Sequence, residues 1–215
     1  MNTITIIGTG NMARGIATRA LAAGRSVELL NRDADKAAAV AAELSTAASG
    51  TVTSGTVGQA PAGDIVVLAL PFDAAKEVVA SYGAALAGKT VVDITNPVNF
   101  ETFDSLVVAP GTSAAEEIAA LTPGNVVKAF NTTFAGALVA GETQGQILDG
   151  FIAGDNADAT AAVASLMTDG GMRPLVVGAL KRSRELEGFQ FLVMTLQANP
   201  AFETFNWNTG LKIVG

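Results

Sequence analysis

The sequence predicts an α/β protein, with a Rossmann-like, doubly wound, mostly parallel sheet and a short C-terminal helical lobe. Short runs rich in Val and Ile alternate with segments of helical periodicity, as in parallel strands joined by helical crossovers. The first run, residues 3–7, leads into the turn Gly8-Thr9-Gly10-Asn11-Met12-Ala13, and a second run, 26–30, follows about 20 residues later. This order of strand, glycine turn and helix is typical of the phosphate-binding start of a dinucleotide fold.

The remaining elements continue the alternation. Strands buried on both faces are predicted at 64–70, 90–94, 125–130, 151–154 and 174–177. Helices are predicted at 33–46, 73–82, 113–121, 157–167 and 181–197, and the stretches 101–112 and 141–146 are interpreted as loops. We expect a dinucleotide-binding domain over residues 1–178, and a helix and aromatic tail over 179–215 that complete a second site.

The glycine turn predicts the pyrophosphate site. Gly8 permits a sharp turn, Gly10 lets the backbone approach a pyrophosphate, and Ala13 keeps the helix close to the strand. The free N–H groups around Asn11 and Met12 then face the anion.

The end of the second run favours NADP(H) over NAD. NAD enzymes usually carry an acidic residue there, which accepts hydrogen bonds from the ribose 2′-hydroxyl, whereas this chain has Asn31 and Arg32. Arg32 can bind a 2′-phosphate as a planar fork, and Lys36 adds a charge one helical turn later. Asp33 argues in the opposite direction, and a solvated role for both cations stays open.

Residues that follow the predicted strands are candidates for the site lining, because ligands of doubly wound sheets bind at the C-terminal ends of the strands. They are Leu70, Pro71, Phe72, Asn96, Pro97, Asn131, Thr132 and Phe134. The amides of Asn96 and Asn131 can hydrogen-bond a ribose or a nicotinamide carboxamide. Pro71 and Pro97 have a second interpretation, in which they only end strands.

Composition limits the classes of function. With 49% hydrophobic and 15% charged residues, a chain of 215 residues can bury a large core, and its net charge of −7 argues against a nucleic-acid partner. The apolar stretches are short and no leader pattern is visible, so we expect no membrane span and a cytoplasmic protein. The absence of cysteine excludes disulfides and iron–sulfur clusters.

Missing residue types also narrow the chemistry. The chain has no histidine, which excludes a general-acid histidine, and no cluster of cysteine and histidine for a catalytic zinc, so no metal site is predicted. Its only tyrosine, Tyr82, is followed four residues later by Leu86 instead of the lysine that short-chain dehydrogenases use. If the protein is an enzyme, the reaction that remains is hydride transfer between a nicotinamide and a delocalised ring, which needs no catalytic side chain.

The last 35 residues suggest where such a ring binds. Three cations, Lys181, Arg182 and Arg184, start the final helix, where they either meet an anionic partner or form a solvated surface cluster. The helix is apolar nearly all round, which is typical of a core or a dimer interface, so a homodimer stays open. Beyond it, Trp207 and two phenylalanines offer faces on which a flat ring could stack, or they pack in the core.

Five motifs together resemble the NADP oxidoreductases that use coenzyme F420, a deazaflavin. They are Gly8-Thr9-Gly10-Asn11-Met12, Asn31-Arg32 with Lys36, Leu68-Ala69-Leu70-Pro71, Lys128-Ala129-Phe130-Asn131-Thr132 and Arg173-Pro174-Leu175. The resemblance implies that Thr9, Asn31, Arg32 and Lys36 hold the 2′-phosphate, with asparagine in place of the family's serine at position 31. Near the deazaflavin, archaeal members carry a histidine and a proline where this chain has Asn131 and Phe134.

The segment from Lys128 to Asn131 is also similar to the NADPH-binding domain of the STEAP ferric reductases, which pass a hydride to a flavin. We therefore expect F420 or a flavin as the second redox substrate, bound by Asn131, Thr132, Phe134, Arg184 and Trp207. Two alternatives stay open. The glycine turn with Asn31-Arg32 resembles pyrroline-5-carboxylate reductase, and the same fold could serve a non-catalytic NADPH sensor.

Overall fold

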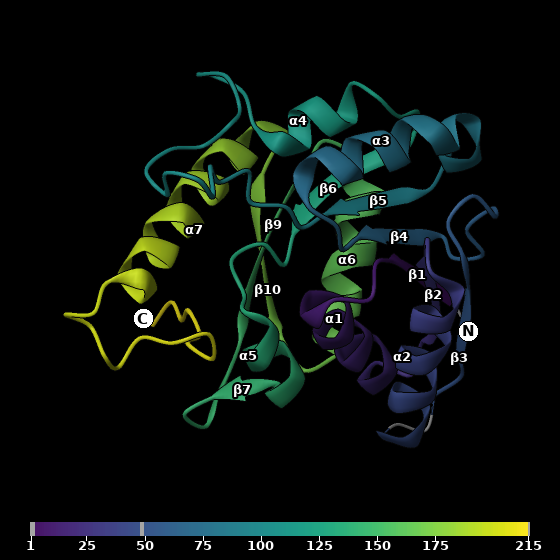
Figure 1. Cartoon of the computed structure of the whole chain (residues 1–215), viewed down its shortest axis with the longest axis horizontal. Helices are drawn as coiled ribbons and strands as arrows, with labels where there is room; N and C mark the ends of the chain where they lie inside the picture. Colours follow the sequence, from purple (N-terminus) through teal and green to yellow (C-terminus); the bar gives the residue numbers. More distant parts are fainter. Residues whose placement is uncertain (1–2, 48–49, 215) are drawn as a thin grey trace.

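The computed structural model describes residues 3–47 and 50–214, in which an eight-stranded sheet carries helices on both faces, as predicted (Figure 1). Its strands are β1 (Thr3–Ile7), β2 (Ser26–Asn31), β3 (Val52–Thr56), β4 (Ile65–Leu68), β5 (Thr90–Asp93), β6 (Asn125–Ala129), β9 (Asp149–Gly154) and β10 (Arg173–Gly178). They lie in the order β10-β9-β6-β5-β4-β1-β2-β3. The six strands β3, β2, β1, β4, β5 and β6 are parallel to one another. Strand β9 is antiparallel to β6, and β10 is parallel to β9.

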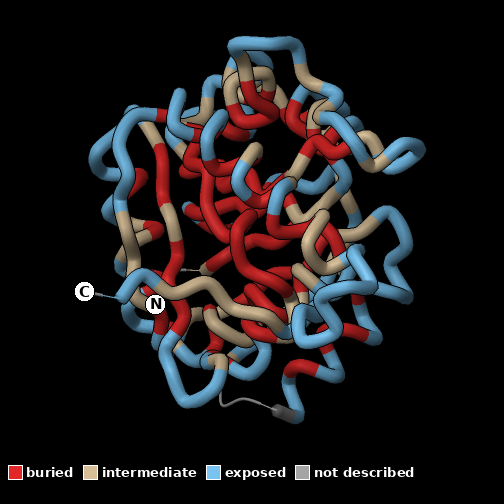
Figure 2. The backbone as a smooth tube through the Cα atoms, turned by 90° about the vertical axis from the view of Figure 1, so that its left-hand side faces the viewer, coloured by how far each residue is buried: buried red, intermediate tan, exposed pale blue. Residues whose placement is uncertain are grey.

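The helices cover the two faces of the sheet with separate cores. They are α1 (Asn11–Ala22), α2 (Ala34–Ala47), α3 (Phe72–Tyr82), α4 (Ala114–Ala119), α5 (Ala135–Ala140), α6 (Ala157–Asp169) and α7 (Ser183–Ala198), with short 3₁₀ turns η1 (Gly83–Leu86) and η2 (Leu180–Arg182). Along β1, Ile6 packs into the core beneath α1, α2 and α6, and its neighbour Ile7 into the core beneath α3 and α4. Because successive strand residues point to opposite faces, the central strands are buried on both, as Figure 2 shows.

Three local features differ from the predictions. The strand at 174–177 is not buried on both faces, because β10 lies at the sheet edge and leaves Val176 57% and Val177 38% exposed. The stretch 141–146 was wrongly interpreted as a loop, since it contains most of a small hairpin, β7 (Glu142–Thr143) with β8 (Gln146–Ile147). Sequence reasoning also missed β3 and α5, because β3 has no apolar run and α5 is only six residues long, too short to show a helical pattern.

The C-terminal part returns to the sheet. Val193 and Met194 of α7 pack with Val98 and Phe134 in a third, small core. The tail after α7 ends near β9, where Asp149 accepts hydrogen bonds from Arg173, Lys212 and the N–H of Ile213. Burial raises the pKa of Asp149, but these hydrogen bonds outweigh it and hold the pKa at about 2.

The outer face of α7 stays open to solvent. Phe189 is 43% and Leu192 57% exposed, so the helix is not buried all round and the homodimer remains a prediction. None of the helices in the described part of the chain has the length and apolar character needed to cross a bilayer.

Candidate functional site

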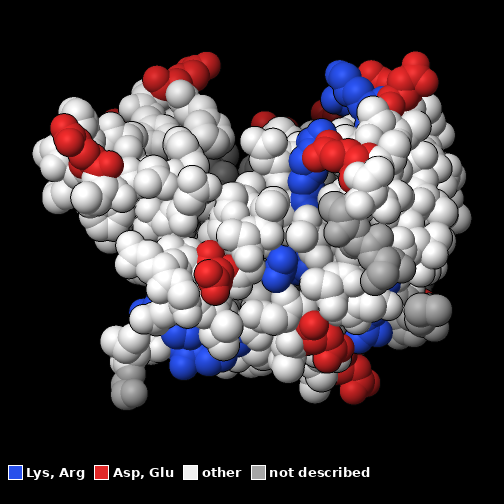
Figure 3. Space-filling view, turned by 90° about the horizontal axis from the view of Figure 1, so that it is seen from below, with Lys and Arg blue, Asp and Glu red and all other residues white. Residues whose placement is uncertain are grey.

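Three neighbouring hollows lie along the C-terminal ends of the parallel strands. The first, of about 120 Å³, lies between the ends of β2 and β4 and is lined by Gly8, Asn31 and Arg32 among others. The second, of about 520 Å³, extends from the β1–α1 turn across the ends of β4 and β5. The third, of about 530 Å³, is enclosed by α1, α5, α7 and the tail. Seen from below, the surface is hollowed between two lobes whose facing walls carry few charged side chains (Figure 3).

The two glycines of the turn differ in what the fold requires of them. Gly8 has φ +121°, and a Cβ there would clash with the carbonyl oxygen of Ala69, so the fold itself requires this glycine. Gly10 has φ −74°, which any residue adopts, and a Cβ there would meet no protein atom within 4 Å. The space over Gly10 opens on the second hollow.

Helix α1 begins directly behind this space. Its N-terminus has no side-chain cap and no acidic residue in the first turn, so its N–H groups and positive dipole end face the hollow. The pyrophosphate site predicted from Gly8, Gly10, Asn11 and Met12 remains a prediction, and an anion in this space would face the N–H groups of the helix start.

Of the four predicted 2′-phosphate residues, Asn31 and Arg32 line the first hollow, whereas Thr9 and Lys36 do not. Asn31 Nδ2 donates to Thr9 Oγ1 at 2.6 Å, which fixes both side chains, and Arg32 is exposed and makes no ion pair within the described ranges. Asp33 does not compete for a ribose, because its Oδ1 accepts the N–H groups of Asp35 and Lys36 and caps α2. The N–H of Lys36 is the main cause of the lowered pKa of Asp33.

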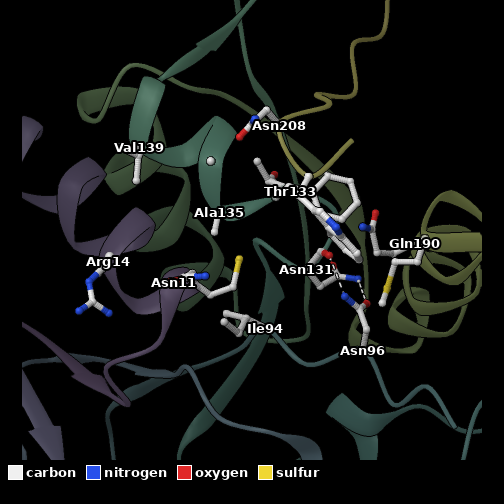
Figure 4. Close-up of a pocket in the computed structure, with 15 residues that line it drawn as sticks. Asn11, Arg14, Ile94, Asn96, Asn131, Thr133, Ala135, Val139, Gln190 and Asn208 are labelled. Atoms are coloured by element: carbon white, nitrogen blue, oxygen red, sulfur yellow. Dashed lines mark hydrogen bonds between the residues drawn. The ribbon is translucent and has the colours of Figure 1, made fainter. Parts of the chain in front are cut away.

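The third hollow brings together the predicted ring-binding residues Asn131, Phe134 and Trp207 (Figure 4). Phe134 and Trp207 meet edge to face, with ring centroids 5.5 Å apart. Asn131 Nδ2 donates to Asn96 Oδ1 at 3.0 Å, and Asn96 Nδ2 donates to the carbonyl of Asn131 at 2.9 Å. Both asparagines are therefore held in fixed positions at the ends of β5 and β6.

The backbone before Asn131 is strained. Phe130 has φ +60°, a left-handed conformation that costs roughly 1–3 kcal/mol in a residue other than glycine. It turns the chain sharply at the end of β6 and directs Asn131 toward the third hollow. Such strain collects at functional sites.

A buried ion cluster lies beneath this end of the sheet. Lys128 Nζ is 2.8 Å from Asp93 Oδ2 and 2.8 Å from Glu187 Oε1, and it also donates to the carbonyl of Thr95. All three charged side chains are fully buried. Burial raises the pKa of Glu187, although Lys128 acts against this shift. Glu187 also accepts the N–H groups of Ala114 and Ala115, so the cluster joins α7 and α4 to β5 and β6.

Sequence reasoning missed this cluster, although a signal was present. Lys128 interrupts a strand predicted to be buried on both faces, and Asp93 occupies the paired position in the neighbouring strand β5. Sequence reasoning also missed Gln190. This polar residue lies within the apolar stripe of α7 and lines the third hollow.

Of the other predicted site residues, five line the second hollow, and Thr132 and Arg184 line none of the three hollows. Leu70, Pro71, Phe72, Asn96 and Pro97 line the second hollow. Thr132 is buried behind the third hollow without lining it. Arg184 lies away from the hollows and binds both carboxylate oxygens of Glu116, at 2.8 and 2.6 Å. Arg182 pairs with one carboxylate oxygen of Glu185, at 2.6 Å.

Comparison with known proteins agrees with this geometry. A family model described as NADP oxidoreductase, coenzyme F420-dependent, matches residues 3–97. The F420-dependent NADP reductase of Methanothermobacter thermautotrophicus is 31% identical over 99% of this chain and 94% of its own. Metalloreductase STEAP3 of Rattus norvegicus is 33% identical over 86% of this chain, which spans only 35% of that protein.

Solved structures give the same picture of the fold. A hypothetical protein of Sinorhizobium meliloti matches with a TM-score of 0.74 and 29% identity, over 84% of this chain and 86% of its own. A pyrroline-5-carboxylate reductase of Coxiella burnetii matches with a TM-score of 0.60 over 96% of this chain and 73% of its own. At 17% identity, the second likeness shows the fold alone.

Proposed function

Because the chain belongs to the family of NADP oxidoreductases that depend on coenzyme F420, we propose that it transfers a hydride reversibly between NADPH and the planar ring of a deazaflavin or a flavin. In this proposal, residues 1–178 hold the dinucleotide, and residues 179–215 complete the site of the ring.

One observation carries the proposal: the second and third hollows adjoin. Both are lined by Asn11, Met12, Ile94, Asn96 and Met194, so molecules bound in the two hollows would meet across these side chains. The glycine turn places an anion at the start of the second hollow, while aromatic side chains border the third. A dinucleotide in one and a flat ring in the other would thus have their reactive ends side by side.

The residues around the end of β2 and the glycine turn support NADP(H). Arg32 and Lys36 would bind the 2′-phosphate, and Thr9 and Asn31 would add hydrogen bonds, since their mutual bond leaves Thr9 Oγ1 free to donate.

In this proposal, the side chains position the two reacting rings and take no part in acid–base catalysis. NADPH, when bound, provides the hydride, and a delocalised ring accepts it without help from a side-chain acid. The linked amides of Asn96 and Asn131 would orient the groups that meet between the hollows. We propose no catalytic residue, since the sequence has no histidine and the titratable cluster at Lys128 is fully buried.

The test is a panel assay of NADPH oxidation with F420, FMN, FAD, riboflavin and pyrroline-5-carboxylate as separate acceptors. We expect turnover with F420 first and with the flavins second, and an Arg32→Ala variant with a higher KM for NADPH and an unchanged KM for the acceptor. Turnover with pyrroline-5-carboxylate alone would replace this proposal by imine reduction. NADPH binding without oxidation by any acceptor would replace it by a sensor.

A further inference from the structure

The buried ion cluster also holds the turn that follows β5. Lys128 Nζ donates to the carbonyl of Thr95, and Asp93 Oδ1 accepts the N–H of Thr95 at 2.9 Å. Lys128 Nζ and Asp93 Oδ2 also bind each other, at 2.8 Å. The backbone of Thr95 is therefore held on both sides by side chains that are themselves fully buried.

The next residue, Asn96, lies where the second and third hollows adjoin. It is half-buried and lines both of them. Its Nδ2 donates to the carbonyl of Asn131 at 2.9 Å, and its Oδ1 accepts from Asn131 Nδ2 at 3.0 Å, as Figure 4 shows. Among the described residues these bonds use one N–H and one lone pair of the Asn96 amide, so a second N–H and a second lone pair are left for a ligand.

Backbone carbonyls define which way the two amides point. Asn131 Nδ2 donates to the carbonyl of Leu186 at 3.3 Å, and Asn96 Nδ2 donates to the carbonyl of Asn131. A carbonyl oxygen can only accept a hydrogen bond, so each amide must turn its nitrogen toward that carbonyl. Neither amide can be reversed without losing a bond, and the orientation of Asn96 in the groove is fixed.

These contacts form a closed circuit that begins and ends at Lys128. From Lys128 it passes through the turn after β5 to Asn96, and from there to Asn131. From Asn131 it continues to the carbonyl of Leu186, which directly precedes Glu187 in α7. Glu187 Oε1 lies 2.8 Å from Lys128 Nζ and closes the circuit. The circuit joins β5, β6 and α7, the three elements that meet at the junction of the two hollows.

Stability alone is a poor explanation for a lysine in this place. Well-packed apolar residues of similar volume are often as stabilising as a buried ion cluster, because burying charge is costly. What an apolar side chain cannot do is hold three segments at set angles. The ammonium group has three N–H donors, and Lys128 has three acceptors for them: Asp93, Glu187 and the carbonyl of Thr95.

We propose that Lys128 is a positioning residue for the proposed hydride transfer, which fixes the orientation of the Asn96 amide at the junction of the two hollows. Lys128 is fully buried and lines neither hollow, so it acts through Thr95 and α7 and touches neither reacting ring. The inference rests on the proposed function and deepens it, because it names the residue that sets the geometry of the junction from within the sheet.

The first arm of the test needs no substrate. NMR spectroscopy of ¹⁵N-labelled protein records the side-chain amide resonances of Asn96 and Asn131 in the native protein and in Lys128→Met. A second variant, Lys128→Met/Asp93→Asn/Glu187→Gln, has no charge left in the cluster. It escapes the penalty of unpaired buried carboxylates and keeps an oxygen at position 93 for the N–H of Thr95, so it folds even if the single variant does not.

In both Lys128 variants we expect the two amide resonances to move to the positions of water-exposed asparagines. Glu187→Gln is the matched control, because it changes the charge of the same cluster and keeps the bond from Lys128 to Thr95. Its Asn96 and Asn131 resonances should stay native. Native resonances in both Lys128 variants, or the same displacement in Glu187→Gln, would overturn the inference.

The second arm measures NADPH oxidation with the acceptor that the native protein reduces fastest. Misplacement of the reacting groups should lower kcat of the Lys128 variants about tenfold to a hundredfold, while KM for NADPH stays within about threefold, since the dinucleotide phosphates bind elsewhere. Leu21→Ala is the control for lost stability. Leu21 is buried near the end of α1, about 15 Å along the helix from Asn11 at the groove.

Leu21→Ala should keep the native kcat per folded molecule. A native kcat in the Lys128 variants, or an equal fall of kcat in Leu21→Ala, would mean that Lys128 only stabilises the fold and would refute the proposal. If the native protein reduces no acceptor, the proposed function fails, and the amide resonances still decide whether Lys128 orients the junction.

Discussion

Replacing Lys128 by methionine should destabilise the protein strongly and in a pH-dependent way. The change keeps most of the buried volume but removes the cation that lies 2.8 Å from both Asp93 and Glu187. Two buried carboxylates then face one another without a counter-charge, and breaking a buried ion pair in this way costs about 3–5 kcal/mol. A typical domain has about 5–15 kcal/mol of stability, so the loss is a large fraction of the total.

The sign of the pH dependence follows from Glu187. Burial raises the pKa of Glu187 above the ordinary glutamate value of 4.5. Between pH 4.5 and the pKa in the folded state, the folded state therefore binds more protons than the unfolded state. The contribution of Glu187 is thus fully present below pH 4.5 and is lost as the pH rises through the folded pKa. Without Lys128 the folded pKa rises further, so Lys128→Met should lose more stability at pH 8 than at pH 5.5.

Urea unfolding followed by circular dichroism at these two pH values measures the effect. Lys89→Met is the matched control, because Lys89 is half-buried and its Nζ donates to the carbonyl of Gly63; we expect a loss of about 1 kcal/mol. The Glu187→Gln variant should show a weaker dependence of stability on pH, because the amide cannot ionise. Its oxygen still accepts the N–H groups of α4. A Lys128→Met protein no less stable than Lys89→Met, or equally destabilised at both pH values, would refute this reasoning.

Three further predictions concern the groove and the tail. Arg32→Ala should lower the affinity for NADPH about tenfold to a hundredfold and leave NADH binding unchanged in a fluorescence titration; equal binding of both cofactors by the native protein would contradict the assignment. Gly10→Ala should weaken NADPH binding with little change in melting temperature, because its Cβ meets no protein atom within 4 Å, whereas Gly8→Ala should lower the melting temperature. Asp149 should contribute about 2 kcal/mol of stability above pH 3.8 that is lost as the pH falls through its folded pKa of about 2, and in Asp149→Asn this acid-labile part should be absent from urea titrations.

Sequence periodicity predicted the central part of the fold, because burial there depends on the strand pattern alone. The runs that became β1, β4 and β5 are apolar at most buried positions, with Thr5, Thr90 and Asp93 as the polar exceptions, and the glycine turn before α1 needs only local backbone geometry. The edge strand β3 could not be predicted in the same way. Residues 52–56 are Val-Thr-Ser-Gly-Thr, and β3 exists because β2 offers a pairing edge and not because of its own side chains.

The site was predicted only where the function depends on local sequence. The resemblance to the F420-dependent family grouped Thr9 with Asn31, and the two side chains do meet, because the ends of the neighbouring parallel strands β1 and β2 lie at one edge of the sheet. The position of Gln190 depends instead on how α7 docks, and that is decided by contacts of Glu187 with Lys128 and α4, distant in sequence. Arg184 illustrates the same limit, because its partner Glu116 lies 68 residues away.

The most direct test of the central claim is the fate of a deuterium label at C4 of NADPH. The protein is mixed with stereospecifically deuterated NADPH and F420, whose deazaflavin ring accepts hydride at a carbon that does not exchange with water, and the products are analysed by mass spectrometry. Direct transfer between rings in adjoining hollows predicts that the label appears on the reduced deazaflavin from one face of the nicotinamide only. Label in the solvent, label from both faces, or oxidation of NADPH without reduction of the ring would contradict the account.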